Sequence, residues 1–355
     1  MKQIESVKIQ RDSAIELLRI IAMWMIVFYH FHVHVLSTDS GFVFFKAIQI
    51  PIHISVPLFV LISGYFGICF NTKGLCRLFT QVGFYSLSLL FIVYLISLFS
   101  TPLHSLSKQQ IVNGLFFISR TNNLWFIRTY LLLYLISPFW NKVLQGQTAR
   151  QRTFLLMVLA FMVFYMSNIG QLPDLSGKSI IYFLLLYTIG HSIREYKLSE
   201  RFKAKWLLSL FLTMNLLLVV LYMVGYKNVL FRVGLWTLAF KYNSPLCVLS
   251  AIAVFMLFTK MSFQNYFVNK IAASVFAVYL ISENTLVNVY LNDIVRYLLN
   301  SFSVAPMYVL LVVLTTSVIL FCVLIDKLTL GPQRYLSICL SICLDKVINK
   351  IKMYI

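Results

Sequence analysis

Long apolar stretches separated by short polar segments dominate the 355-residue chain. Many approach the ~20 residues with which an α-helix crosses a bilayer. A further apolar piece at 229–240 is too short to span and carries Arg232, so we interpret it as interfacial or re-entrant, with an eleventh span as the alternative. The pattern predicts ten transmembrane helices, at 14–36, 43–70, 75–100, 122–141, 153–169, 179–194, 206–226, 244–259, 268–291 and 305–329.

Composition supports an all-α, polytopic membrane protein. Hydrophobic residues make up 60% and charged residues 12% of the chain, whereas a soluble domain is roughly 25% charged. The net charge of +19 does not indicate nucleic-acid binding, because Lys and Arg are scattered between the apolar stretches and form no patch. No Pro/Gly/Ser-rich linker divides the stretches, so we expect one transmembrane domain at 1–333.

The basic residues predict the topology. With the N-terminus inside, the inner segments carry 20 of the 30 Lys and Arg and the outer segments carry 8. This bias is the positive-inside pattern, and it places both termini in the cytoplasm. The first stretch lacks a small-residue cleavage site, so we expect it to be a span and no secretory signal. The six cysteines fall in apolar segments or on the inner side, which argues against a disulfide framework.

The last residues, 334–355, are predicted to form a basic amphipathic helix. Leu336, Leu340, Leu344 and Val347 share a helical face, and lysines lie elsewhere. Such a helix lies on an anionic lipid surface. We therefore expect a cytoplasmic anchor here, and ordinary apolar-face cysteines at Cys339 and Cys343 rather than acylated ones.

The first stretch concentrates ionisable residues, which are costly inside a membrane and therefore candidates for function. Glu16 precedes Arg19 by three positions. His30 follows Arg19 by eleven, which returns to nearly the same helix face about 16 Å further along the axis. His34 shares the face of His30 and His32 does not, and both are expected at the outer interface. A metal site at His30 and His34 is a weaker alternative, because no matched acidic ligand follows.

The second stretch contains Pro51 and Pro57, which interrupt backbone hydrogen bonding, and then Ser63, Gly64 and Tyr65. The small residues allow close helix approach, and irregular helices are tolerated where they line a cavity. Helix packing is the preferred role of Ser63, because no base lies near it in the sequence.

Other polar residues are candidates for the same site. Lys73 and Arg77 follow the second stretch at its inner end, where topology alone also supplies cations. Arg128, in the fourth stretch with Trp125, either snorkels to the outer interface or pairs inside. The ninth stretch holds Ser282, Glu283 and Asn284. We expect Glu283 to need His30 or Arg128 as a partner.

These segments together resemble the acyltransferase 3 family of integral membrane proteins, which includes O-acetyltransferases of bacterial surface polysaccharides. The matching segments, in family order and over most of the chain, are "IELLRIIAMWMIVFYH", "SVPLFVLISGYF", "LWFIRTYLLLYLISP", "YNSPLCVLSAIAVFMLF" and "VYLISENTLV". Two features depart from the family pattern. The basic cluster after the second stretch is thin, and Ser282 stands where many relatives have a second His.

The resemblance implies a ten-helix bundle that takes an acyl group from cytosolic acetyl-CoA and places it on a sugar hydroxyl at or beyond the outer leaflet. It implies that His30 is the essential histidine, that Arg19 is the helix-1 cation and that Arg77 lies where relatives contact the donor. It also implies a bacterial cytoplasmic membrane, with acyl-CoA as co-substrate and no permanently bound cofactor.

The chemistry expected of this site is general base catalysis by His30, oriented by Glu283, because neutral imidazole is suited to deprotonating a hydroxyl. Arg19, Lys73 and Arg77 would hold the phosphates of the donor. The alternatives are a transporter or flippase for a polysaccharide precursor, and a glycan polymerase. Against the first, the sequence has no convincing internal repeat; against the second, it has no large outer loop.

Overall fold

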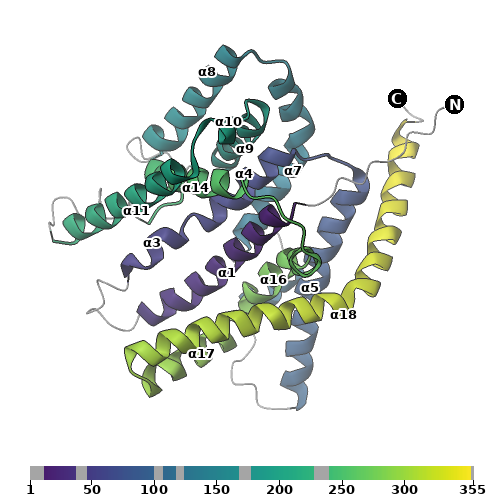
Figure 1. Ribbon diagram of the computed structural model, residues 1–355. Helices are drawn as coiled ribbons and strands as arrows, with labels where there is room; N and C mark the ends of the chain where they lie inside the picture. Colours follow the sequence, from purple (N-terminus) through teal and green to yellow (C-terminus); the bar gives the residue numbers. More distant parts are fainter. Residues whose placement is uncertain are drawn as a thin grey trace.

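The computed structural model describes residues 12–36, 46–99, 107–116, 124–167, 177–227 and 240–352. Throughout these ranges the secondary structure is helical and contains no strand (Figure 1), which confirms the all-α class. The apolar piece at 229–240 falls outside the described residues except for Phe240.

Every predicted apolar stretch contains at least one helix. The main helices are α1 (Ser13–Leu36), α3 (Gln49–Ile52), α4 (Ser55–Phe66), α5 (Thr72–Phe99), α6 (Lys108–Leu115), α7 (Trp125–Gln145), α8 (Ala149–Ala160) with the π-helix η1 (Phe161–Met166), α9 (Ile180–Glu195), α10 (Leu198–Arg201), α11 (Ala204–Lys227), α14 (Pro245–Phe258), α15 (Tyr266–Ala272), α16 (Val275–Ser282), α17 (Thr285–Ser301) and α18 (Val304–Lys352).

The expected count of ten spans is not confirmed. Among the described residues, six helices are long and apolar enough to cross a membrane, or seven if one bent pair forms a span. Two of the shorter helices, α9 and α14, have only 16 and 14 residues, which is below the usual length of a straight span. The cytoplasmic placement of the termini remains a prediction.

Two of the predicted stretches are broken, and the prolines of the second had indicated an irregular helix. The second divides into α3 and α4 at a turn around His53 and Ile54, between Pro51 and Pro57. The ninth divides into α15, α16 and α17, and the chain bends by 84° between Tyr266–Ser282 and Thr285–Leu298. Apolar periodicity did not reveal this second break, because the residues on both sides of it are apolar.

Helix α1 runs through the middle of the bundle and contacts α3, α4, α15, α16 and α18 (Figure 1). Two clusters of buried apolar side chains lie around it, and Phe59, Trp125, Phe126 and Tyr242 pack against both clusters. These shared aromatic side chains mark the boundary at which the candidate site lies.

Glycines allow α4 and α9 to pack with their backbones in close contact. A Cβ atom added to Gly64 would overlap the carbonyl oxygen of Tyr187, and one added to Gly190 would overlap that of Leu61. This contact agrees with the close approach expected from the Ser63, Gly64 and Tyr65 segment, since small residues bring transmembrane helices together. It fixes α4, which lines the candidate site.

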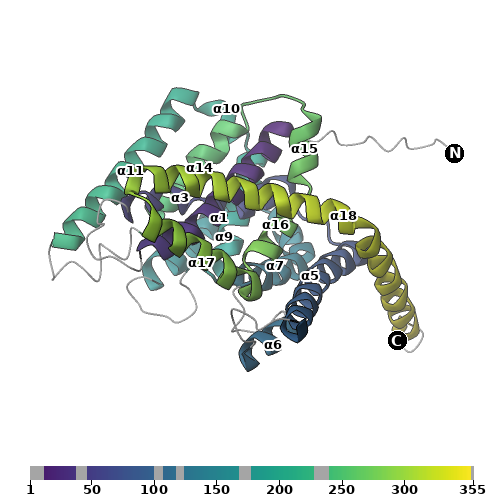
Figure 2. The same ribbon diagram turned by 90° about the horizontal axis from the view of Figure 1, so that it is seen from below.

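Helix α18 continues through the boundary expected at 333–334, and Figure 2 shows that its second half turns away from the bundle. Pro332 lies inside the helix, where a missing amide donor favours a bend. Before the bend, the buried Asp326 accepts a hydrogen bond from the hydroxyl of Tyr85 on α5, at 2.8 Å. Beyond it, the side chains of Leu336, Leu340 and Val347 are exposed, as an amphipathic helix on lipid requires.

The packing of α4 on α9 predicts that Gly190→Ala destabilises the protein strongly, because backbone atoms of α4 must move to admit a methyl group. The matched control is Gly331→Ala in α18, since nothing lies within 4 Å of its added Cβ. The control should be neutral or gain up to about 1 kcal/mol from helix propensity. Thermal unfolding in detergent measures both variants, and equal melting temperatures would contradict this account.

Candidate active site

A cavity of about 340 Å³ lies between α1, α4, α7 and α16. This volume is in the range of small-molecule sites, which are mostly apolar with a few converging polar groups. The lining includes Arg19 and His30 from α1, Ser63 from α4 and Glu283 after α16. Its aromatic walls are Tyr29, Phe59, Trp125, Phe126, Tyr130, Tyr242, Phe276 and Tyr279.

His30 and Glu283 form a pair inside this cavity. The Nε2 atom of His30 lies 3.1 Å from Oε2 of Glu283. The side chain of Glu283 is 3% exposed and that of His30 is 37% exposed, so the carboxylate is buried behind an imidazole that faces the cavity. Of the two partners expected for Glu283, the structure brings His30 to it.

The break in the ninth stretch positions Glu283. Glu283 is the residue after the last turn of α16, and the next residue, Asn284, is the N-cap of α17. The side chain of Asn284 accepts a hydrogen bond from the amide of Leu286 at 3.0 Å. Ser282 donates to the other carboxylate oxygen of Glu283 at 3.4 Å. Ser282, Glu283 and Asn284 are all buried at the bend, and each side chain makes a hydrogen bond or ion pair there.

Arg19 lines the other end of the cavity and is already paired. Its Nη1 atom donates to both carboxylate oxygens of Glu16, at 3.0 and 3.2 Å. Glu16 is 7% exposed as a residue, and the side chain of Arg19 is 33% exposed. Glu16 therefore fixes the guanidinium at the cavity wall and offsets part of its charge.

Ser63 and Trp125, both predicted site residues, also line the cavity. The hydroxyl of Ser63 donates to the carbonyl of Phe59 at 2.9 Å. It also lies 3.4 Å from the hydroxyl of Tyr130. This arrangement fits the expected packing role of Ser63. The Nζ atom of Lys178 lies 5.2 Å from the ring centroid of Trp125, a favourable cation–π distance.

Seven predicted site residues do not line this cavity. Glu16, Ser282 and Asn284 lie directly beside lining residues, and four others lie elsewhere. Lys73 and Arg77 are exposed on the first turns of α5, and Arg128 is half-buried on α7. Tyr65 lines a second cavity of about 440 Å³, together with His191, Arg194 and Glu195 at the end of α9.

The position of His32 at the depth of the outer interface stays a prediction, but its side chain is not exposed. His32 is completely buried. Its Nε2 atom lies 2.6 Å from the hydroxyl of Tyr308, and its Nδ1 atom lies 3.1 Å from the amide nitrogen of Gln49. These contacts tie α1 to α3 and α18. The side chain of His34 lies outside the described residues, so the weaker metal alternative with His30 is not tested.

Sequence analysis missed most of the aromatic lining. Tyr29 directly precedes His30, and Phe126 and Tyr130 lie four positions apart on one face of α7. Tyr242 follows the apolar piece at 229–240, and its position in the sequence did not indicate that it lines a cavity. The cavity became recognisable only when the packing brought α1, α4, α7 and α16 together.

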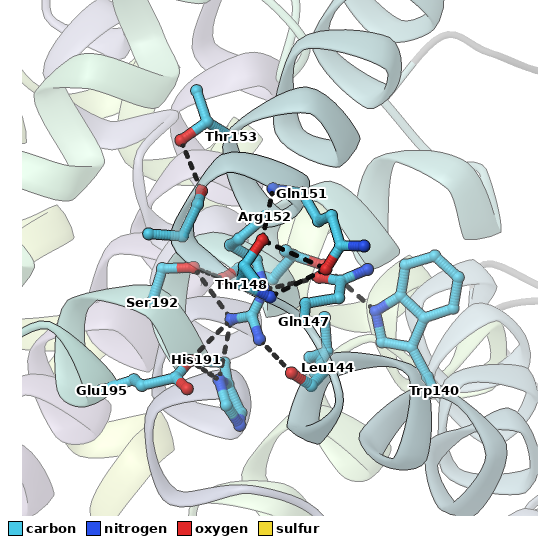
Figure 3. Close-up of polar contacts among 12 residues, drawn as sticks. Trp140, Leu144, Gln147, Thr148, Gln151, Arg152, Thr153, His191, Ser192 and Glu195 are labelled. Carbon is cyan, nitrogen blue, oxygen red and sulfur yellow. Dashed lines mark hydrogen bonds and ion pairs between the residues drawn. The ribbon is translucent and has the colours of Figure 1, made fainter.

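A second polar cluster surrounds Arg152 of α8, which is 1% exposed (Figure 3). Its Nη1 atom lies 2.9 Å from Oε2 of Glu195 and 3.2 Å from Nδ1 of His191, and its Nε atom donates to Gln147 at 2.8 Å. Nη2 donates to the carbonyl of Leu144. A buried guanidinium needs partners of this kind, and here they join α7, α8 and the end of α9.

The fold and the cavity define an all-helical membrane protein in which a cavity-facing histidine is paired with a buried carboxylate. A family model described as an acyltransferase domain matches residues 12–326, which is nearly the whole chain. The chain belongs to the acyltransferase 3 family, as the resemblance in the sequence indicated. No curated protein and no solved structure gives a significant match.

The position of Glu283 depends on the cap of α17, so Asn284→Ala should lower stability by about 1 kcal/mol, as loss of an N-cap does. Asn284→Ser keeps an oxygen that accepts from the amide of Leu286, adds no charge beside Glu283 and serves as the matched variant. Thermal unfolding in detergent compares the two. An Ala variant as stable as the Ser variant would show that the cap does not hold the bend.

Proposed function

We propose that this acyltransferase moves an acetyl group, or another short acyl group, from acyl-CoA in the cytosol to a hydroxyl of a surface or exported polysaccharide or its lipid-linked precursor. Membership of the acyltransferase 3 family supports the reaction class. The pairing of His30 with Glu283 in a cavity that Arg19 also lines carries the proposal further.

His30 acts as the general base in this proposal. Glu283 engages Nε2 and holds the ring, as the buried carboxylate of a catalytic triad does. The proton of the acceptor hydroxyl passes to Nδ1, the ring nitrogen that Glu283 does not hold. The hydroxyl oxygen forms a bond to the thioester carbonyl carbon, and the carbon–sulfur bond then breaks. The proton on His30 passes to the departing thiolate, so the enzyme returns to its starting state.

Glu283 stabilises the imidazolium that forms during this step. A carboxylate 3.1 Å from the ring favours the charged form of the histidine while the bonds change. Ser282 and the bend hold that carboxylate in place, which lowers the cost of reorganising it. Glu283 is therefore a catalytic partner of His30.

Arg19 binds the donor at the cytosolic end of the cavity. It lies eleven residues before His30 on α1, which corresponds to about 16 Å along the helix axis. A long thioester arm can span this distance with its acyl carbon near His30 and its charged end near Arg19. The N–H groups of Arg19 other than those on Nη1 provide donors for phosphate oxygens, while Glu16 fixes the side chain.

The aromatic walls support a sugar as the acceptor. Tyr29, Trp125 and Tyr242 lie around His30 in the cavity lining and offer flat apolar surfaces with polar edges. The acceptor hydroxyl reaches Nδ1 of His30 from this side. The acyltransferase acts in the cytoplasmic membrane of a bacterium, where both substrates are available.

Replacement of the base should remove most of the transfer. We expect His30→Ala to lower turnover by about 100 to 10,000-fold, which is the usual contribution of a general base. The measurement is the transfer of radiolabelled acetyl from acetyl-CoA to glycan in inside-out membrane vesicles. The matched control is His32→Gln, because His32 lies on the same helix and its ring contacts Tyr308 and Gln49, which are outside the cavity lining. Wild-type transfer by a folded His30→Ala variant would overturn the proposal.

Replacement of Arg19 should weaken binding of the acyl-CoA donor and leave binding of the acceptor unchanged. We expect Arg19→Gln to raise the KM for acetyl-CoA by about tenfold or more, since a charge-assisted hydrogen bond to phosphate is lost. The KM for the glycan acceptor should change little. The same vesicle assay measures both constants. An unchanged donor KM would assign Arg19 to structure alone, through its pair with Glu16.

A further inference from the structure

The second cavity lies where α4 ends, between the last turns of α7 and α9. Its volume of about 440 Å³ is in the range of ligand sites. Tyr65 and Phe66 form an aromatic wall, and Gly67, Ile68 and Cys69 continue it as extended chain. Asn141 and Gln145 of α7 and His191, Arg194 and Glu195 of α9 supply the polar side.

The aromatic wall of this cavity is held in a fixed conformation. The Nη1 atom of Arg194 donates to the carbonyls of Tyr65 and Phe66, at 3.3 and 3.1 Å. The amide group of Asn141 donates to the carbonyl of Ile68 at 3.0 Å. A pre-formed wall reduces the entropy that ligand binding costs.

The charge of this cavity favours an anion. The one carboxylate in its lining, that of Glu195, is paired with the buried Arg152 at 2.9 Å (Figure 3). Glu195 is therefore offset by Arg152 rather than by Arg194, whose planar guanidinium suits a phosphate. The exposed cations Lys142, Lys197 and Arg201 follow the lining residues in the chain and add to the positive potential.

The two cavities approach each other along α4. Ser63 lines the first cavity, and Tyr65 and Phe66, two and three residues later, line the second. At 1.5 Å per residue this separation is less than about one helical turn along the axis, although residues two apart point to different faces of the helix. An elongated ligand with a charged ring system at one end would pass around α4 to place its two ends in the two cavities.

We propose that the second cavity binds the phosphorylated adenine nucleotide at the end of the acyl-CoA donor, with its ring on Tyr65 and Phe66 and a phosphate on Arg194 and His191. This inference rests on the proposed function, and it adds a second binding site to it. Lys73 and Arg77, exposed on the first turns of α5 soon after Cys69, then supply outer charge to the same nucleotide end rather than to the cavity around His30.

The test is direct binding of radiolabelled coenzyme A to the purified full chain in detergent, with adenosine 3′,5′-bisphosphate and pantetheine as competitors. We expect both competitors to displace the label from the wild type. Arg194→Gln should raise the Kd for coenzyme A by about tenfold or more and should abolish competition by the bisphosphate. Competition by pantetheine should persist, since pantetheine has no nucleotide.

The matched control is Arg150→Gln, which removes the same charge from an exposed position outside the lining of the cavity. Its Kd should stay within about twofold of the wild type, because an exposed charge is screened by salt. Gln145→Glu is a second variant for the case that loss of the Arg194 contacts unfolds the protein. Gln145 is exposed and lines the cavity, so an added carboxylate there should repel the phosphates and also raise the Kd.

The outcomes separate this inference from the proposed function. Wild-type affinity for coenzyme A in folded Arg194→Gln or in Gln145→Glu would overturn the nucleotide site and leave the acyl-CoA donor intact. Failure of the wild-type protein to bind coenzyme A would overturn both the nucleotide site and the proposed acyl-CoA donor. An equal effect of Arg150→Gln and Arg194→Gln would reduce the site to a general surface potential and would also overturn it.

Discussion

The burial of the Glu283 carboxylate is the constraint on which the rest of the site depends. Its side chain is 3% exposed and lies between apolar helices. Moving such a group from water costs several kcal/mol unless it is hydrogen-bonded or paired. His30 and Ser282 supply these partners, so the carboxylate fixes which face of α1 points into the cavity.

The ninth stretch is broken at this carboxylate. The 84° bend ends α16 at Ser282 and begins α17 at Thr285, and Asn284 caps the new helix. Irregular backbone at membrane depth is tolerated where it is buried in protein or lines a cavity. The cavity lies at the boundary between the two apolar clusters, where aromatic side chains pack against both.

Sequence alone predicted the helices well and their breaks poorly. Each apolar stretch became a helix because an unpaired backbone is too costly in lipid for another conformation. Hydropathy does not distinguish one long helix from two short ones. Pro51 and Pro57 indicated the turn near His53, whereas the bend at Glu283 became visible only in the structure. Continuity of α18 past Pro332 was missed because the apolar stretch ends near 329, whereas the helix continues through a bend into the amphipathic segment.

Prediction of the site was uneven for a related reason. Arg19 and His30 could be placed together because they share one helix, where spacing fixes the face. Glu283 was a candidate from its apolar setting, but the choice between His30 and Arg128 needed tertiary packing. Lys73 and Arg77 follow α4 closely in sequence but lie exposed on α5, outside the cavity around His30. Tyr130 and Tyr242 had no signal that periodicity could detect.

The central claim is that His30 and Glu283 act as one catalytic unit. A double-mutant cycle of His30→Gln and Glu283→Gln, followed by acetyl transfer in vesicles at equal expression, tests it most directly. Residues that act as a unit give non-additive losses. The account predicts that the double variant is no slower than His30→Gln alone. Losses that multiply in the double variant, or full activity of Glu283→Gln, would contradict it.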